Sequence, residues 1–286
     1  MTDAVYTLDL PRTHRSCAIF SSPHSGSDYP ETFLARTRLT RLQIRSSEDA
    51  FVDELFRGVP EFGATLISAK TPRACVDLNR SPDDLDPALI EGASKRFISP
   101  RISAGLGVIP RVVAEGRVIT DEKISLAEAR GLLSRCWYPY HRKLEALIAE
   151  SHGVFGNVLL FDCHSMPDDA LVAAPEIRGR RPDVILGDRF GVSCDRWVME
   201  GAVELFRRQG FEVVRNAPFA GGYITQTYGR PRQGVHALQI EINRSLYMNE
   251  RRIEKRRDFA EFSERIRAVA EGLVSLGNRP LRMAAE

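Results

Sequence analysis

The stretch VLLFDCHS, residues 158–165, decides the fold expected of this 286-residue chain. Its first four residues are apolar without alternation, which is typical of a strand covered on both faces by other layers. Polar residues follow at once, and side chains placed just after a strand meet loops from neighbouring strands at the carboxyl edge of an open α/β sheet. The stretch therefore predicts a buried strand that carries polar groups into a site.

Other short apolar runs extend this pattern along the chain. Further strands are predicted at 17–20, 64–68, 74–78, 184–186, 212–214 and 237–242. Helical patterns lie between these runs, and an alternation of strands and helices is typical of an α/β fold. We therefore expect a single domain over residues 1–286, with a mixed, mostly parallel sheet flanked by helices.

Four helices are predicted from end signals and periodicity. Residues 125–150 open with capping-box spacing, and Pro139 predicts a kink within them. Ser193 is the predicted cap of a second helix, and residues 258–276 show an amphipathic helical pattern. Ser47 is the predicted cap of a fourth helix in the first third of the chain.

Composition and charge restrict the class of protein. Apolar residues make up 43% and charged residues 27% of the chain, as in soluble globular proteins. The net charge of +2 excludes a strongly basic nucleic-acid-binding protein. There is no run of about 18 apolar residues and no apolar core of a secretory signal, so we expect a cytoplasmic protein without a membrane span. The oligomeric state stays open.

Two histidines follow predicted strands. His24 lies in the turn after the first predicted strand, and His164 follows the strand quoted above. Because such strands end at a common edge, the two imidazoles are a candidate metal pair, with Asp162 as a carboxylate that orients one of them. The alternative interpretation of His24 is a hydrogen-bonded loop histidine. In the segment of His164, the alternative is that Cys163 acts as a nucleophile with a histidine base.

Two other segments carry charge at predicted strands. Arg73 and Arg80 flank the run at 74–78, and arginine forks suit bidentate binding of carboxylates, with a surface Arg–Asp pair as the alternative. Glu241 lies inside an otherwise apolar strand, and a glutamate is seldom buried unless it is paired or reactive. Beside a metal-bound water, Glu241 would fit the role of general acid and base. The alternative interpretation is a carboxylate that lies on a half-exposed edge strand.

Six motifs in this order resemble the N-formylglutamate amidohydrolase (N-formylglutamate deformylase) family, and together they extend over most of the chain. They are SSPHSG at 21–26, DLNRSPDD at 77–84, PYH at 139–141, FDCHSMP at 161–167, APFAGGYITQTYG at 217–229 and LQIEINRSLYMNE at 238–250. The family is similar in turn to the zinc carboxypeptidase and aspartoacylase group. In that group an HxxE pair and a later histidine bind zinc, and a late glutamate is the acid and base.

The resemblance implies roles for three residues. His24 and His164 match the zinc-binding histidines, and Glu241 matches the catalytic glutamate. One position departs from the pattern: Ser27 stands three residues after His24, where HxxE requires a carboxylate, and serine is a poor zinc ligand. The third ligand must therefore come from another segment.

Asp49 is the favoured third ligand, because the resemblance implies an acidic position after the first motif. With Ser47 as a helix cap, Glu48 and Asp49 would fall in the first turn of the following helix. Glu48 and Asp28 are the alternative ligands.

The remaining implied roles concern the substrate. Arg73, Asn79 and Arg80 match the residues that bind the substrate carboxylate, and Arg80 or Arg73 would also stabilise the oxyanion. Arg230 is a further predicted contact. Tyr223 is another, because the glycines before it predict a close approach of the backbone to a ligand.

The expected reaction is therefore hydrolysis of N-formyl-L-glutamate, or of a similar small acidic N-acyl amino acid. It would use one divalent metal ion, with Zn²⁺ favoured, and Glu241 as general acid and base. The products would be glutamate and formate, which would place the reaction in histidine degradation. The alternatives are an amidase or carboxypeptidase for another N-acyl amino acid or short acidic peptide, and a noncatalytic binding protein of the same fold, which the missing HxxE carboxylate motivates.

Overall fold

A seven-stranded sheet forms the centre of the computed structural model, which describes residues 5–96, 98–177 and 179–277. In spatial order its strands are β1 (Tyr6–Asp9), β3 (Thr65–Ala69), β2 (Ala18–Ser22), β6 (Val158–Met166), β9 (Val235–Asn243), β7 (Val184–Gly187) and β8 (Val213–Arg215). The four strands from β3 to β9 in this order are parallel. Strands β1 and β7 run antiparallel to β3 and β9, and β8 is parallel to β7. The predicted mixed, mostly parallel sheet is confirmed.

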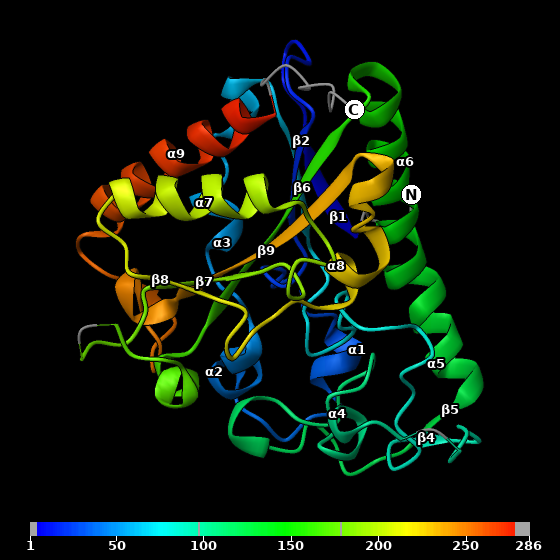
Figure 1. The fold of residues 1–286 in the computed structure, drawn as a ribbon. Coiled ribbons are helices and arrows are strands. Elements are labelled where there is room, and N and C mark those ends of the chain that lie inside the picture. Colours follow the sequence, from blue (N-terminus) through cyan, green and yellow to red (C-terminus); the bar gives the residue numbers. More distant parts are fainter. Residues whose placement is uncertain (1–4, 97, 178, 278–286) are drawn as a thin grey trace.

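Helices cover both faces of this sheet, as Figure 1 shows. One face packs against α3 (Val52–Leu55), α7 (Arg196–Arg208) and α9 (Phe259–Leu276), and the other against α6 (Tyr138–Phe155) and α8 (Tyr223–Tyr228). Shorter elements lie below the sheet in Figure 1: α1 (Glu31–Leu34), α2 (Arg41–Ile44), α4 (Pro100–Ser103), α5 (Leu126–Leu132), β4 (Ile90–Glu91) and β5 (Ile124–Ser125). A small hairpin, β10 (Met248–Asn249) with β11 (Glu254–Lys255), precedes α9. Among the described residues, no helix combines the length and apolarity that crossing a membrane requires.

Side-chain alternation separates apolar from polar residues near the carboxyl end of β6. Cys163 belongs to the apolar core beneath α3, α7 and α9, so its neighbours Asp162 and His164 lie on the opposite face of the strand. Strand β9 pairs with β6 in a register that sets Gln239 opposite Asp162 and Glu241 opposite His164. One face at this end of the two central strands is therefore polar and buried.

The predicted strand at 74–78 is wrong. This segment forms turns, in which the N–H groups of Cys75 and Val76 both donate to the Pro72 carbonyl. Its apolar side chains are nevertheless buried, with Val76 and Leu78 fully inaccessible to solvent. An apolar run reports burial of side chains, and here the backbone hydrogen bonds are made within turns and to other loops and side chains instead of in a sheet.

Two predicted helix caps are also wrong. Ser193 Oγ donates to the Ala237 carbonyl at 2.8 Å, and α7 begins after Asp195. Ser47 ends a short 3₁₀ turn, η1 (Arg45–Ser47), and the next helix begins only after Phe51, whose φ of +68° is left-handed. Asp49 therefore lies in an irregular connection and not in the first turn of a helix.

The long predicted helix at 125–150 exists, with Ser125 Oγ accepting the Glu128 N–H at its start. Its interruption is a π-helical turn, η4 (Leu133–Trp137), between α5 and α6. Pro139 follows directly after this turn, at the start of α6, which continues the helix without a break. The predicted C-terminal helix at 258–276 is confirmed as α9.

Candidate active site at the carboxyl ends of the strands

Two buried histidines face each other beyond the parallel strands β2 and β6. His164 lies near the end of β6, and His24 lies in the turn that follows β2. Their ring centroids are 4.7 Å apart, and the residues are only 2% and 3% exposed. The structure therefore brings together the two imidazoles that the sequence predicted as a pair.

Asp49 completes a cluster of three potential metal ligands. Its Oδ2 lies 3.0 Å from His164 Nδ1 and 3.4 Å from His24 Nδ1. Its N–H donates to the His24 carbonyl at 2.9 Å, which ties the two segments together. One potential ligand atom from each residue lies within 4.8 Å of the others, so Asp49 occupies the place expected of the third ligand.

The two alternative carboxylates lie elsewhere. Glu48 accepts hydrogen bonds from the Tyr29 hydroxyl at 2.7 Å and from Arg45 Nε at 3.0 Å. Asp28 is exposed and borders a separate cavity. Ser27, at the position of the missing HxxE carboxylate, is exposed as well.

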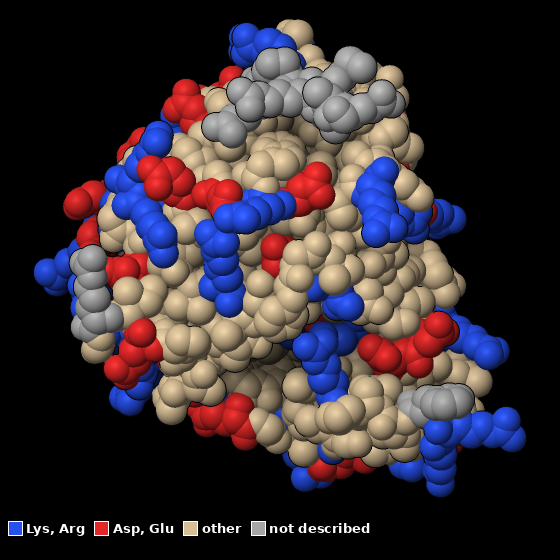
Figure 2. Space-filling model, in the orientation of Figure 1, with Lys and Arg blue, Asp and Glu red and all other residues tan. Residues whose placement is uncertain are grey.

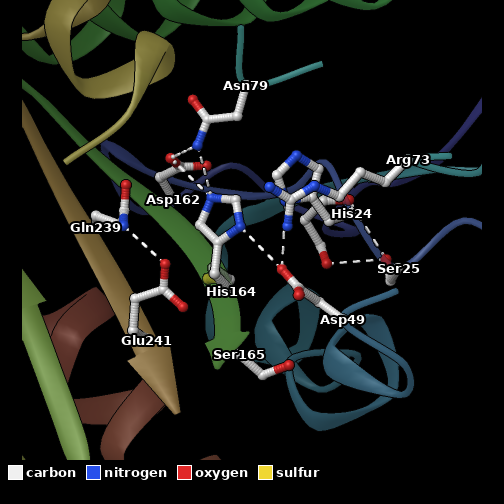
Figure 3. A network of polar contacts seen from close by, with 12 residues as sticks. His24, Ser25, Asp49, Arg73, Asn79, Asp162, His164, Ser165, Gln239 and Glu241 are labelled. Carbon is white, nitrogen blue, oxygen red and sulfur yellow. Dashed lines mark hydrogen bonds and ion pairs between the residues drawn. The ribbon is translucent and has the colours of Figure 1, made fainter. Parts of the chain in front are cut away.

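Each histidine meets a further carboxylate through its other ring nitrogen. His24 Nε2 lies 2.7 Å from Asp77 Oδ1, and His164 Nε2 lies 3.0 Å from Asp162 Oδ2. Figure 3 shows His164 lying between Asp162 and Asp49. Metal-binding histidines usually donate their second N–H to such an acceptor, which fixes the ring and leaves the other nitrogen for the metal. Two imidazoles and one carboxylate therefore fit a divalent metal such as zinc.

The charges of these groups depend on one another. Burial would lower the pKa of His164, but the carboxylates of Asp162 and Asp49 raise that pKa well above its ordinary value of 6.5. Burial would likewise raise the pKa of Asp49, but its hydrogen bonds to both histidines and the charge of Arg244 lower that pKa well below 3.8. The carboxylates around His164 thus favour a cation at its imidazole, and a proton and a metal ion would compete for its Nδ1.

Glu241 lies beside the cluster on the neighbouring strand. It is opposite His164 in the register of β9 with β6, and its Oε1 accepts a hydrogen bond from Gln239 Nε2 at 2.8 Å. Burial, together with the charge of Asp49, raises the pKa of Glu241 to about 7, although His164 and Arg73 act in the opposite direction. A carboxyl group with this pKa can both accept and return a proton near neutral pH.

Arg73 and Arg80 converge on Asp77, the carboxylate behind His24. Arg73 Nε lies 3.0 Å and Arg80 Nε 3.9 Å from Asp77 Oδ2. Arg80 Nε also donates to the Leu106 carbonyl at 3.3 Å. The Arg73 side chain is 25% exposed, and its two terminal nitrogens have no hydrogen-bond partner among the described residues. This arginine can therefore offer a fork to an anion at the site.

Asn79 uses its amide within the protein. Its Nδ2 lies 3.0 Å from both Asp162 Oδ2 and His164 Nε2, and its Oδ1 accepts the Ile224 N–H at 2.8 Å. A Cβ on Gly222 would lie 2.5 Å from Asn79 Nδ2, so this glycine permits the close approach. The glycine loop thus lies closely against Asn79, and its predicted approach to a ligand stays a prediction. The Asn79 amide is already engaged, with its Nδ2 donating to Asp162 beside His164.

Tyr223 begins α8 directly beside Asn79, and its N–H donates to the Asn79 carbonyl at 3.4 Å. Its half-buried ring packs edge-on against Trp137 and His141, with centroids 5.6 and 5.4 Å away. Tyr223 therefore lies at the margin of the site, and its contact with substrate stays a prediction.

Two sequence-based interpretations lose their support. Arg230 is exposed and its backbone pairs with Val235, the first residue of β9. Glu241 lies six residues further on, or about 20 Å along an extended strand, so Arg230 is at the opposite edge of the sheet from the cluster. Cys163 faces the apolar core, and burial raises the pKa of its thiol well above 9.0, which is unfavourable for a nucleophile.

Two members of the network were not assigned from the sequence. Asp77 holds His24, and Arg244 Nη2 donates to Asp49 Oδ1 at 2.8 Å. Both belong to motifs quoted above, so the available signals were a carboxylate at the start of DLNR and an arginine three residues after Glu241.

Three comparisons with known proteins identify the family. The sequence model of the N-formylglutamate amidohydrolase family matches residues 16–248. An N-formylglutamate deformylase of Pseudomonas aeruginosa is 32% identical over 266 residues, covering 91% of this chain and 93% of the relative. One of Pseudomonas putida is 31% identical over 238 residues, covering 81% and 82%. The crystal structure of an N-formylglutamate amidohydrolase from Ralstonia eutropha superposes with a TM-score of 0.89 at 33% identity, over 96% of this chain and 99% of that chain. The chain therefore belongs to the N-formylglutamate amidohydrolase family.

Proposed function

We propose that the protein hydrolyses N-formyl-L-glutamate to formate and L-glutamate, with a divalent metal held by His24, Asp49 and His164. The observation that carries the proposal is the position of Glu241 opposite His164 on the neighbouring strand. This position sets a carboxyl group with a near-neutral pKa beside a cluster that fits a metal. The relatives named N-formylglutamate deformylase support the choice of substrate.

The residues that would hold the metal are fixed before it binds. The Nδ1 atoms of His24 and His164 and a carboxylate oxygen of Asp49 would be its ligands, while Asp77 and Asp162 hold the two rings through Nε2. A divalent ion, with zinc as the first choice, would supply Lewis-acid activation of water and of the acyl carbonyl.

Glu241 would move the protons of the reaction. With a pKa of about 7, it is partly ionised at neutral pH, and the ionised form accepts a proton from the attacking water. The resulting carboxylic acid donates that proton to the amide nitrogen of the departing glutamate. Gln239 fixes one carboxyl oxygen, Oε1, while Oε2 has no protein partner among the described residues.

The arginines would recognise the acidic substrate. Arg73 offers the free end of its guanidinium to a carboxylate of the substrate. Arg80 approaches the same oxygen of Asp77 and would bind a second carboxylate or the developing oxyanion. In the view of Figure 2 the surface is hollowed below its centre, with Lys or Arg side chains beside the hollow and Asp or Glu side chains near it as well.

Formate release from matched substrates tests this proposal. N-formyl-L-glutamate should give the highest kcat/KM. N-formyl-L-glutamine, which has the same shape but lacks the side-chain charge, should be about 10- to 100-fold poorer, because one charged hydrogen-bonded contact is lost. Equal rates on both would contradict recognition by the arginines. No formate from either, in protein that carries a metal, would contradict the deformylase assignment.

A further inference from the structure

We propose that Arg244 is the positioning residue that sets Asp49 for metal binding, an inference that rests on the proposed metal-dependent function. Asp49 lies in an irregular connection, between the end of η1 and Phe51 with its left-handed φ of +68°. The hydrogen bond from Asp49 N–H to the His24 carbonyl fixes the Asp49 backbone but leaves its carboxylate free to turn. Another segment must therefore orient the side chain.

Arg244 provides this contact. It follows β9, three residues after Glu241, and is 6% exposed. Its Nη2 donates to Asp49 Oδ1 at 2.8 Å. Because Oδ1 is engaged by the guanidinium, Oδ2 is the oxygen turned towards the two histidines.

The other donors of Arg244 fix the guanidinium itself. Its Nε donates to Ser165 Oγ at 3.1 Å, and Nη2 also donates to the Ser165 carbonyl at 3.3 Å. Its Nη1 donates to the Ser46 carbonyl at 3.3 Å. Ser165 directly follows His164, and Ser46 lies three residues before Asp49. One arginine thus joins the ends of β6 and β9 to the segment that carries the third ligand.

Arg244 serves the protein and not the substrate. All three guanidinium nitrogens already donate to protein acceptors, and the side chain is 7% exposed. Arg73 differs, because its terminal nitrogens have no partner among the described residues. A planar guanidinium can hold several acceptors at fixed angles while supplying a positive charge to the buried Asp49, and a lysine ammonium supplies the charge without the fork.

Metal affinity in Arg244→Lys tests the proposal. Zn²⁺ affinity is measured by competition with a chromophoric chelator, and the absorption bands of the Co²⁺-loaded protein report the ligand geometry. The variant should bind Zn²⁺ about 10- to 100-fold more weakly than wild type and show altered Co²⁺ bands, with unchanged far-UV circular dichroism. Arg45→Lys is the matched control, because Arg45 pairs with Glu48 on the same segment; its Zn²⁺ affinity should stay within about twofold of wild type.

Ser165→Ala asks the same question if Arg244→Lys does not fold. It removes the hydroxyl that accepts from Arg244 Nε, and we expect Zn²⁺ affinity to fall several-fold. Wild-type affinity and wild-type Co²⁺ bands in either folded variant would overturn the role of Arg244. Because binding is measured without substrate, a wild-type protein that binds no Zn²⁺ contradicts the proposed function as well. If the wild-type protein binds Zn²⁺ and releases formate, and the variants bind Zn²⁺ as the wild type does, only the role of Arg244 is contradicted.

Discussion

His164 and His141 are both buried and both hydrogen-bonded through each ring nitrogen, yet their partners differ. His164 lies between two carboxylates, and these raise its pKa well above 6.5 against the effect of burial. His141 lies between the Leu78 carbonyl and the Tyr228 hydroxyl, each 2.8 Å away, and burial lowers its pKa to about 4. The charge of the partners, and not burial, therefore decides which histidine can hold a cation.

The neutral histidine belongs to the frame of the site. His141 stacks on Trp137 with centroids 3.9 Å apart, and it binds the carbonyl directly before Asn79. Trp137 Nε1 donates to the Arg80 carbonyl at 3.0 Å, directly after Asn79. The π-helical turn and α6 thus support the DLNR loop on both sides of Asn79, while His164 belongs to the cluster that this loop borders.

Replacing His164 should have the largest effect. His164→Ala removes a proposed ligand and deprives the buried carboxylates of Asp49 and Asp162 of the histidine that they share, so kcat/KM for formate release should fall by about 10⁴-fold or more. Bound zinc, measured by elemental analysis, should fall with it. Stoichiometric zinc in a folded His164→Ala protein would break the distinction drawn between the two histidines.

Glu241→Gln should separate metal binding from proton transfer. We expect kcat to fall by about 10²- to 10⁴-fold with zinc retained, because the isosteric amide cannot accept the proton. In the wild type, protonation inactivates the base, so kcat/KM should fall as pH drops below about 7 and level off above it. If Glu241→Gln keeps the wild-type rate and the same fall of kcat/KM at low pH, another group carries out the proton transfer.

Arg73→Met should act mainly on substrate binding, although it also removes the ion pair with Asp77 behind His24. Loss of a charged fork should raise KM for N-formyl-L-glutamate by about 10- to 100-fold. Arg230→Gln is the matched control, because the structure places Arg230 at the opposite edge of the sheet, and its KM should stay within about twofold of wild type. An unchanged KM in Arg73→Met, or a raised one in Arg230→Gln, would contradict the placement of the substrate.

His141→Gln should have the smallest effect on turnover and a specific effect on acid stability. The pKa of His141 is lower in the folded state than its ordinary value of 6.5, so protonation favours unfolding. Neutral His141 contributes fully to the free energy of unfolding above pH 6.5. This contribution is lost as the pH falls, by up to about 1.4 kcal/mol per pH unit, until about pH 4. Denaturant unfolding between pH 4 and 7 should therefore show a shallower decline in the variant, and parallel curves would argue against a neutral His141.

The central strands and the residues on them were predictable from the sequence. A side-chain period of two fixes which residues share a face, and parallel strands end at one edge of the sheet. Asp162, His164 and Glu241 could therefore be placed near one another before the structure was known. The turn segment at 74–78 was not predictable in this way, because burial on a loop and burial in a strand leave the same apolar pattern.

The position of Asp49, the proposed third ligand, and of its support depends on the path of an irregular segment. Asp49 reaches the histidines because η1 ends at Ser47 and the backbone turns through Phe51, and no periodic signal predicts such a path. The resemblance to a family, and not the residues alone, favoured Asp49. The contact of Arg244 with Asp49 could not be predicted, because it joins residues 195 positions apart through the reach of a long side chain.

Metal dependence of the reaction is tested by formate release from N-formyl-L-glutamate by the purified protein, before chelation, after chelation and after zinc is restored. We expect activity that is lost with the metal and recovered at about one zinc per chain, since the cluster offers a single set of ligands. Activity that persists in protein shown to be free of metal would contradict this expectation.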